Sequence, residues 1–116
     1  MGITIKNTSI LMGLMSHSFH PILTDIICWV AELYGLVMTE SYRPQRHSGD
    51  VHSTNPVRAI DLRSWYYDDA QALSGAINAK WQYDPKRPHM KVAIIHAIEG
   101  GAEHFHIQVH KNTVRI

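Results

Sequence analysis

Hydrophobic residues recur at helical spacing in the segment that begins at Pro21. The apolar positions that would line one face of this helix are Ile22, Leu23, Ile26, Ile27, Val30 and Leu33. Proline favours the first turn of a helix and glycine favours the position after its end, so Pro21 and Gly35 mark the two boundaries. The pattern predicts an amphipathic helix packed on the core, followed by a short strand at residues 36–39.

The second half of the chain predicts a second helix and three more strands. Residues 57–62 have the composition of a strand, and residues 66–81 that of a helix, with Asp68 and Asp69 suited to its positive N-terminal end. Residues 92–98 and 104–109 flank a glycine-containing segment typical of a hairpin turn. We therefore expect one α+β domain over residues 1–116, with two main helices against a small, largely antiparallel sheet.

Between the two halves, residues 40–56 are polar and carry Pro44, Gly49 and Pro56. This composition predicts a long irregular loop. Loops of that length inside a compact domain are usually functional or disordered, so the segment is a place to look for site residues.

Composition excludes several classes of protein. A chain of 13.2 kDa can form one core, and a net charge of +1 gives no electrostatic footprint for nucleic acid or for an anionic membrane. The apolar run at residues 10–15 is too short to cross a bilayer and has no cleavage pattern after it, so we expect no signal peptide, no anchor and cytoplasmic synthesis. The single cysteine, Cys28, excludes an internal disulfide, and any metal must be bound by histidine and carboxylate.

The final predicted strand carries the candidate chemistry. Its alternation places His104 and His106 on one face, and Glu103 precedes them. Asp61 stands among apolar neighbours, where a carboxylate is costly unless it is paired, either with a cation or in a salt bridge to Arg58 or Arg63. If His52 from the loop reaches the same place, these side chains form the ligand inventory of a catalytic zinc site with an adjacent base.

The remaining histidines have ordinary interpretations. His96 either faces His104 or His106 across the hairpin or is a core histidine with satisfied hydrogen bonds. Four others lie in predicted loops or at helix ends, where solvated or capping roles are expected: His17, His20, His47 and His89.

Three motifs together resemble a known family. They are residues 39–44 (TESYRP), His52 followed by residues 58–63 (RAIDLR), and residues 103–108 (EHFHIQ). In this order they resemble the zinc D-alanyl-D-alanine carboxypeptidase and peptidoglycan endopeptidase family, which shares its metal-site architecture with lysostaphin-type peptidases and the hedgehog signalling domain. The resemblance covers the chain from Pro21 to its end, and three motifs are more specific than one.

The resemblance implies the roles of the site residues. His52, Asp61 and His106 would be the zinc ligands, Arg43 would bind or polarise the substrate carbonyl, and Glu103 would be the catalytic base. The implied reaction is hydrolysis of an amide bond in a peptidoglycan stem peptide by a monomeric cell-wall peptidase, for example a phage lysis enzyme, with no nucleic acid or membrane as partner.

The chain also departs from the family pattern. The spacer between His52 and Asp61 is longer than usual, and Asp50 stands where the family has a serine, so His47 is an alternative first ligand. Regular alternation places Glu103 on the face opposite His104, which leaves Glu99 or His104 as alternative bases.

Two other functions fit the same residues. A zinc-binding module without catalytic activity needs the same ligands and no base. A single-strand nuclease with a His-hydrophobic-His motif is disfavoured, because in many of these enzymes a tyrosine follows the motif, whereas all five tyrosines here precede it, and because the net charge is near zero.

Overall fold

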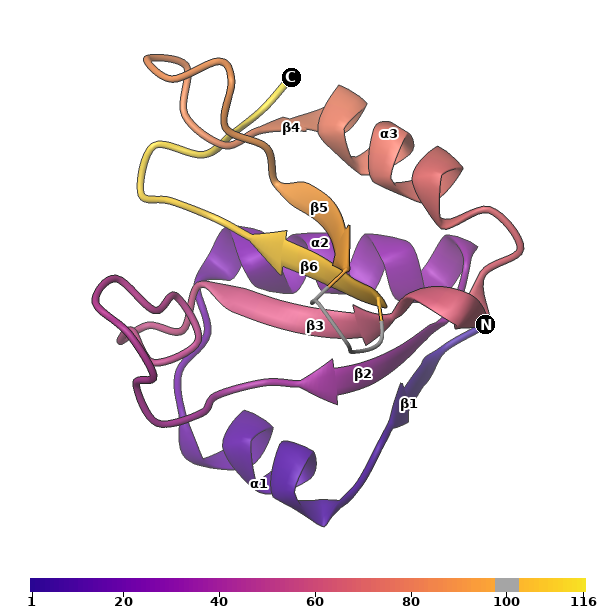
Figure 1. Ribbon diagram of the computed structural model, residues 1–116, viewed down its shortest axis with the longest axis vertical. Helices are drawn as coiled ribbons and strands as arrows, with labels where there is room; N and C mark the ends of the chain where they lie inside the picture. Colours follow the sequence, from indigo (N-terminus) through magenta and orange to yellow (C-terminus); the bar gives the residue numbers. More distant parts are fainter. Residues whose placement is uncertain (98–102) are drawn as a thin grey trace.

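A five-stranded sheet with the strand order β1-β2-β3-β6-β5 forms the centre of the protein (Figure 1). This computed structural model describes residues 1–97 and 103–116. The strands are β1 (Ile3–Ile5), β2 (Leu36–Glu40), β3 (Ala59–Arg63), β4 (Trp81–Gln82), β5 (Ala93–Ala97), β6 (Glu103–Gln108) and β7 (Val114–Arg115). The helices are α1 (Thr8–Ser16), α2 (Pro21–Leu33) and α3 (Ala70–Lys80), with a short 3-10 turn at Ser64–Tyr66.

The strand directions confirm the predicted α+β class. Strand β1 runs parallel to β2, and the other neighbours in the large sheet are antiparallel. Strands β4 and β7 form a separate two-stranded sheet. The described part of β5 pairs with β6, as the hairpin prediction requires, whereas the predicted turn at residues 99–102 lies outside the described residues.

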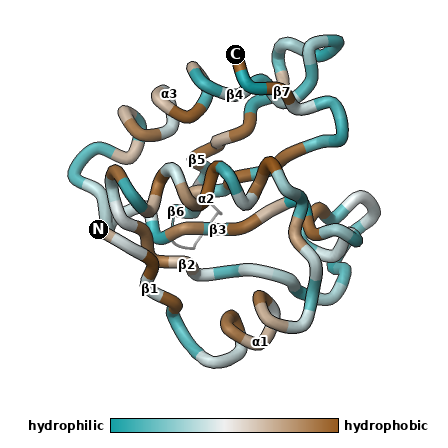
Figure 2. The backbone as a smooth tube through the Cα atoms, turned by 180° about the vertical axis from the view of Figure 1, so that it is seen from behind, coloured by the Kyte–Doolittle hydropathy of each residue, from teal (hydrophilic) through white to brown (hydrophobic). Residues whose placement is uncertain are grey.

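Helix α2 covers one face of the large sheet. Viewed from behind, it crosses in front of β3 and β6, and hydrophobic residues recur along its length (Figure 2). Its apolar side packs in one core with Ile60 and Leu62 from β3 and Phe105 and Ile107 from β6. Burying apolar surface stabilises a protein by roughly 25 cal/mol per Å², so this contact fixes which face of each strand points inward.

The opposite face of the sheet is polar at its centre. Ile60 lies opposite Ile107 in the β3–β6 pair, and the next pair is Asp61 opposite His106. Because successive side chains on a strand alternate between faces, Asp61 and His106 point away from α2. The hydrophobic alternation of the two strands therefore places a carboxylate beside an imidazole.

The N-terminal region differs from the sequence-based expectation of two main helices. Strand β1 and helix α1 were not predicted, although Asn7 provides an N-cap for α1 by accepting a hydrogen bond from the backbone amide of Ile10 at 3.1 Å.

Helix α3 is shorter than the sequence predicts. The predicted helix at residues 66–81 begins later, at Ala70, because the Asp69 side chain caps it by accepting from the Ala72 amide at 3.0 Å.

Residues 41–58 connect β2 to β3 without a helix or a strand, so the predicted long loop is confirmed.

Within the described residues, no helix combines the length and apolar character that crossing a membrane requires.

Candidate metal centre

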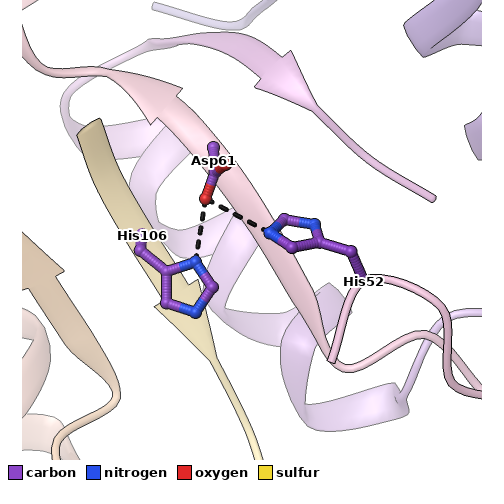
Figure 3. A group of neighbouring side chains, drawn as sticks. All are labelled: His52, Asp61 and His106. Atoms are coloured by element: carbon purple, nitrogen blue, oxygen red, sulfur yellow. Dashed lines mark hydrogen bonds and ion pairs between the residues drawn. The ribbon is translucent and has the colours of Figure 1, made fainter. Parts of the chain in front are cut away.

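Three side chains from separate parts of the chain meet on the polar face of the sheet. The Asp61 carboxylate lies between two imidazoles, with its Oδ1 atom 2.8 Å from Nδ1 of His106 and 3.4 Å from Nε2 of His52 (Figure 3). One potential ligand atom from each residue lies within 4.8 Å of the other two. The structure thus brings together the three residues that the sequence proposed as metal ligands.

Two of these residues come from paired strands and one comes from the loop. Asp61 and His106 are directly opposite in the β3–β6 ladder, so the sheet itself sets their separation. His52 reaches them from the loop, where it is almost completely buried, with 1% exposure. Its backbone amide donates to Oδ1 of Asp50 at 3.1 Å, which holds this part of the loop against the sheet.

The protonation of His52 is set by a backbone group. Its Nδ1 lies 3.0 Å from the carbonyl oxygen of Ser41, and since a carbonyl only accepts, Nδ1 carries the ring hydrogen. Nε2 is then the nitrogen of His52 directed at Asp61, 3.4 Å from its Oδ1. A lone pair and a carboxylate oxygen attract each other only through a cation between them, either a proton or a metal ion.

Asp61 has the charge state that a ligand needs. Burial raises the pKa of its carboxyl, but hydrogen bonding to His106 and His52 and the charge of these two residues outweigh burial, so the pKa lies well below its ordinary value of 3.8. A salt bridge of Asp61 to Arg58 or Arg63 was the other interpretation of its position. Among the described residues its ion-pair partners are the two histidines, and the guanidinium of Arg63 instead lies 4.7 Å from the centre of the Trp65 ring.

The donor set fits a divalent ion such as zinc. A tetrahedral ion about 2.0–2.2 Å from each ligand separates the ligand atoms by roughly 3.3–3.5 Å. The 3.4 Å contact of Asp61 with His52 has that spacing, and the 2.8 Å contact with His106 is a hydrogen-bond distance that would lengthen by about 0.5 Å around an ion. Two imidazoles and one carboxylate supply three ligands and leave a fourth position for water or substrate.

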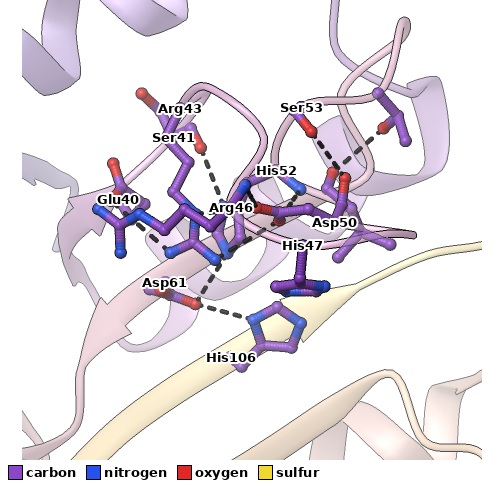
Figure 4. A network of polar contacts seen from close by, with 12 residues as sticks. Glu40, Ser41, Arg43, Arg46, His47, Asp50, His52, Ser53, Asp61 and His106 are labelled. Carbon is purple, nitrogen blue, oxygen red and sulfur yellow. Dashed lines mark hydrogen bonds and ion pairs between the residues drawn. The ribbon is translucent and has the colours of Figure 1, made fainter.

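Arg43 lies beside the cluster, and its guanidinium is held by carboxylates (Figure 4). Its Nε lies 3.4 Å from Oδ2 of Asp50 and its Nη2 lies 3.5 Å from Oδ1, while Nη1 is 3.9 Å from Oε2 of Glu40. Asp50 also accepts from the backbone amide of Arg46 at 3.2 Å. Asp50 therefore connects Arg43 and the backbone of His52 within one buried hydrogen-bond network.

A cavity of about 740 Å³ opens over the cluster. His52, Asp61 and His106 line it together with Arg43. This volume lies within the range of small-ligand sites. The three potential ligands and the arginine therefore face the same cavity.

The candidate bases lie in different places. His104 is partly buried, shares a face with His106 and lines the cavity. Glu103 is exposed at the first position of β6 and does not line the cavity, and Glu99 lies outside the described residues. Glu40 also lines the cavity and is opposite Asp61 in the β2–β3 pair, which the sequence did not suggest.

The other histidines occupy the following positions. His96 is exposed and lies opposite His104, with ring centres 6.2 Å apart, so it is not a core histidine. His47 lines the cavity from an exposed position, and His52 occupies the ligand position for which His47 was the alternative. His20 caps α2 by accepting from the Ile22 amide at 3.2 Å, which confirms the capping role.

Searches with this chain against protein-family models, curated proteins and solved structures find no match. The interpretation of the site therefore rests on its residues and geometry. Sequence reasoning missed the supporting residues Ser41, Asp50 and Gln108, because their contacts depend on how the loop and the strand ends pack. Asp50 had one signal, its position two residues before a proposed ligand.

Proposed function

We propose that this protein is a zinc-dependent peptidase that hydrolyses amide bonds of peptidoglycan stem peptides. The observation that carries the proposal is the convergence of His52, Asp61 and His106 in the lining of a cavity that Arg43 also lines. The substrate class comes from the resemblance of the three sequence motifs to D-alanyl-D-alanine carboxypeptidases and peptidoglycan endopeptidases.

In this proposal His52, Asp61 and His106 hold the ion, and each other residue has a distinct task. Zinc bound by three protein ligands brings the pKa of its water close to neutrality and polarises a carbonyl group. Arg43 donates to the oxygen of the scissile carbonyl, where negative charge develops. Asp50 holds the guanidinium in place, because a fixed donor stabilises a transition state without reorganising during the reaction.

We assign the general base to His104. It lines the cavity on the same face as His106, and an imidazole can accept a proton from water and pass it to the leaving amine. Glu103, the base that the resemblance implies, would have to turn from its exposed position to reach the cavity. Glu40 is a further candidate for the general base, and its carboxylate forms an ion pair with Arg43.

The proposal is tested by incubating the zinc-loaded protein with purified peptidoglycan and with a synthetic stem peptide, and identifying the products by mass spectrometry. We expect cleavage that a chelator abolishes and added zinc restores. His104→Gln should lower kcat by roughly 10²–10⁴-fold while keeping zinc, and His89→Gln, a change at an exposed histidine, should have no effect.

Two outcomes separate the alternatives. If Glu103→Gln or Glu40→Gln is inactive while His104→Gln is active, the base assignment is wrong and the zinc site stands. If zinc binds tightly but neither substrate is cleaved, the peptidase proposal fails and a zinc-binding module without catalytic activity is the better account.

A further inference from the structure

Gln108 at the end of β6 makes two hydrogen bonds that together determine how the His106 ring is oriented and which of its nitrogens faces Asp61. Its side chain is buried, with 8% exposure. Its Nε2 donates to the carbonyl oxygen of Lys91 at 3.0 Å, and its Oε1 lies 3.2 Å from Nε2 of His106. The metal-site residue His106 is therefore connected through one amide to the backbone that precedes β5.

The first bond fixes the orientation of the amide. The nitrogen and oxygen of a glutamine side chain must be assigned from their partners, and a backbone carbonyl accepts only from the nitrogen. The contact with Lys91 thus places the amide oxygen, not the nitrogen, against His106.

The second bond then fixes the imidazole. An amide oxygen only accepts, so Nε2 of His106 carries a hydrogen, and Nδ1 is the ring nitrogen left to bind an ion. Nδ1 is the atom that faces Asp61 Oδ1, at 2.8 Å. An ionised carboxylate also only accepts, so Nδ1 donates in this contact. A bound ion would take the place of that hydrogen, at the point where the three ligand atoms meet.

We propose that Gln108 is the positioning residue of the metal centre: it selects the tautomer and the ring orientation in which His106 binds the ion through Nδ1. This inference rests on the zinc site of the proposed function. It also makes the two histidine ligands unequal, because His52 binds through Nε2 and is oriented by the Ser41 backbone carbonyl, which no side-chain substitution removes. The orientation of His106 depends on one replaceable side chain.

The test compares zinc affinity and ring-nitrogen NMR spectra of the wild type and three variants. Loss of such a supporting partner typically weakens metal binding by about 10–100-fold, so we expect Gln108→Leu to lose about that much affinity. Gln108→Glu keeps an acceptor for His106 and should recover most of the loss. In the zinc-loaded wild type, the spectra should show Nδ1 of His106 bound to metal and Nε2 bearing hydrogen.

Asn78, which is half-buried, provides a control for loss of a side-chain amide that bonds the backbone. Its side chain bonds the backbone of Val92 and Ala93 at 2.9–3.1 Å, and its hydrogen bonds within the described residues involve neither His52, Asp61 nor His106. Asn78→Leu should therefore lower the free energy of unfolding and leave zinc affinity unchanged. The comparison separates a role in positioning His106 from a general role in stability.

The inference is overturned if Gln108→Leu binds zinc as tightly as the wild type, or if wild-type His106 is bound through Nε2. The wild-type spectrum decides the second point even if Gln108→Leu does not fold. Failure of the proposed peptidase function gives a different result: zinc binds with the affinities expected for the wild type and the three variants, but no peptide is hydrolysed. That result would leave the role of Gln108 intact. A wild type that binds no zinc would refute both.

Discussion

Gly13 is the residue through which helix α1 approaches the start of the loop that carries His52. It is buried in α1 against the backbone that follows β2, and a Cβ added there would overlap Oγ of Ser41 and lie 3.2 Å from the Tyr42 carbonyl oxygen. Ser41 is fully buried and its Oγ donates to the Ile10 carbonyl at 2.9 Å, so the hydroxyl cannot turn away without breaking that bond. Gly13→Ala should therefore displace Ser41, whose own carbonyl orients His52.

The size of the effect follows from opposing contributions. Alanine favours the helical state over glycine by up to about 1 kcal/mol. Overpacking a buried site costs about 1–3 kcal/mol, and loss of the Ser41 hydrogen bond costs about 1 kcal/mol more. We expect Gly13→Ala to lower the free energy of unfolding by about 1–3 kcal/mol and to weaken zinc binding as well.

Gly75 in α3 is the matched control. It is exposed, and a Cβ added there would have no heavy atom within 4 Å, so Gly75→Ala should raise the free energy of unfolding by about 0.5–1 kcal/mol. Urea unfolding of the zinc-free proteins measures both variants, and a zinc titration measures the second effect. The reasoning is refuted if Gly13→Ala is as stable as the wild type, or if both variants shift stability in the same direction.

Two further predictions concern the loop. Arg43→Ala should keep zinc and lower kcat/KM by roughly 10²-fold or more, with little recovery in Arg43→Lys because a point charge cannot replace the planar guanidinium; equal turnover of a stem peptide by all three proteins would contradict this. For Asp50, burial raises the pKa, but hydrogen bonds from the His52 and Arg46 amides and from Arg43 outweigh burial and lower the pKa below 3.8. Because the pKa is lower in the folded state, the ionised Asp50 carboxylate contributes its full stability above the unfolded-state pKa, and this contribution is lost as the pH falls through the folded-state pKa. The stability advantage of the wild type over Asp50→Asn should therefore shrink below about pH 4. Urea unfolding across this range that shows a constant or growing advantage would refute the prediction.

Much of the fold follows from alternation and helical spacing. The spacing of apolar residues in α2 and the alternation in β6 are strong because each element has one buried face, and both elements form where they were predicted. Helix α1 was missed because it is apolar on nearly all sides, which obscures a helical period. Only Ile10 and Gly13 are buried in it, while Met12 and Met15 remain exposed.

The sequence predicted which three potential ligands come together, and it predicted fewer of the contacts that support them. Alternation on β6 placed His106 on the polar face, and the sheet register then brought Asp61 opposite it. The position of His52 depends on hydrogen bonds from Asp50 and Ser41 across a loop without regular structure, which no local pattern encodes. The cross-strand neighbour Glu40 likewise depends on the register between β2 and β3, where an irregularity shifts the pairing.

The central claim is that His52, Asp61 and His106 hold one zinc ion per chain. The most direct measurement is the zinc content of the purified wild type, of Asp61→Ala, and of Asp25→Ala, which changes an exposed carboxylate in α2. The account predicts about one zinc per chain for the wild type and Asp25→Ala and a large loss for Asp61→Ala. Full zinc occupancy in Asp61→Ala, or its absence from the wild type after incubation with zinc, would contradict it.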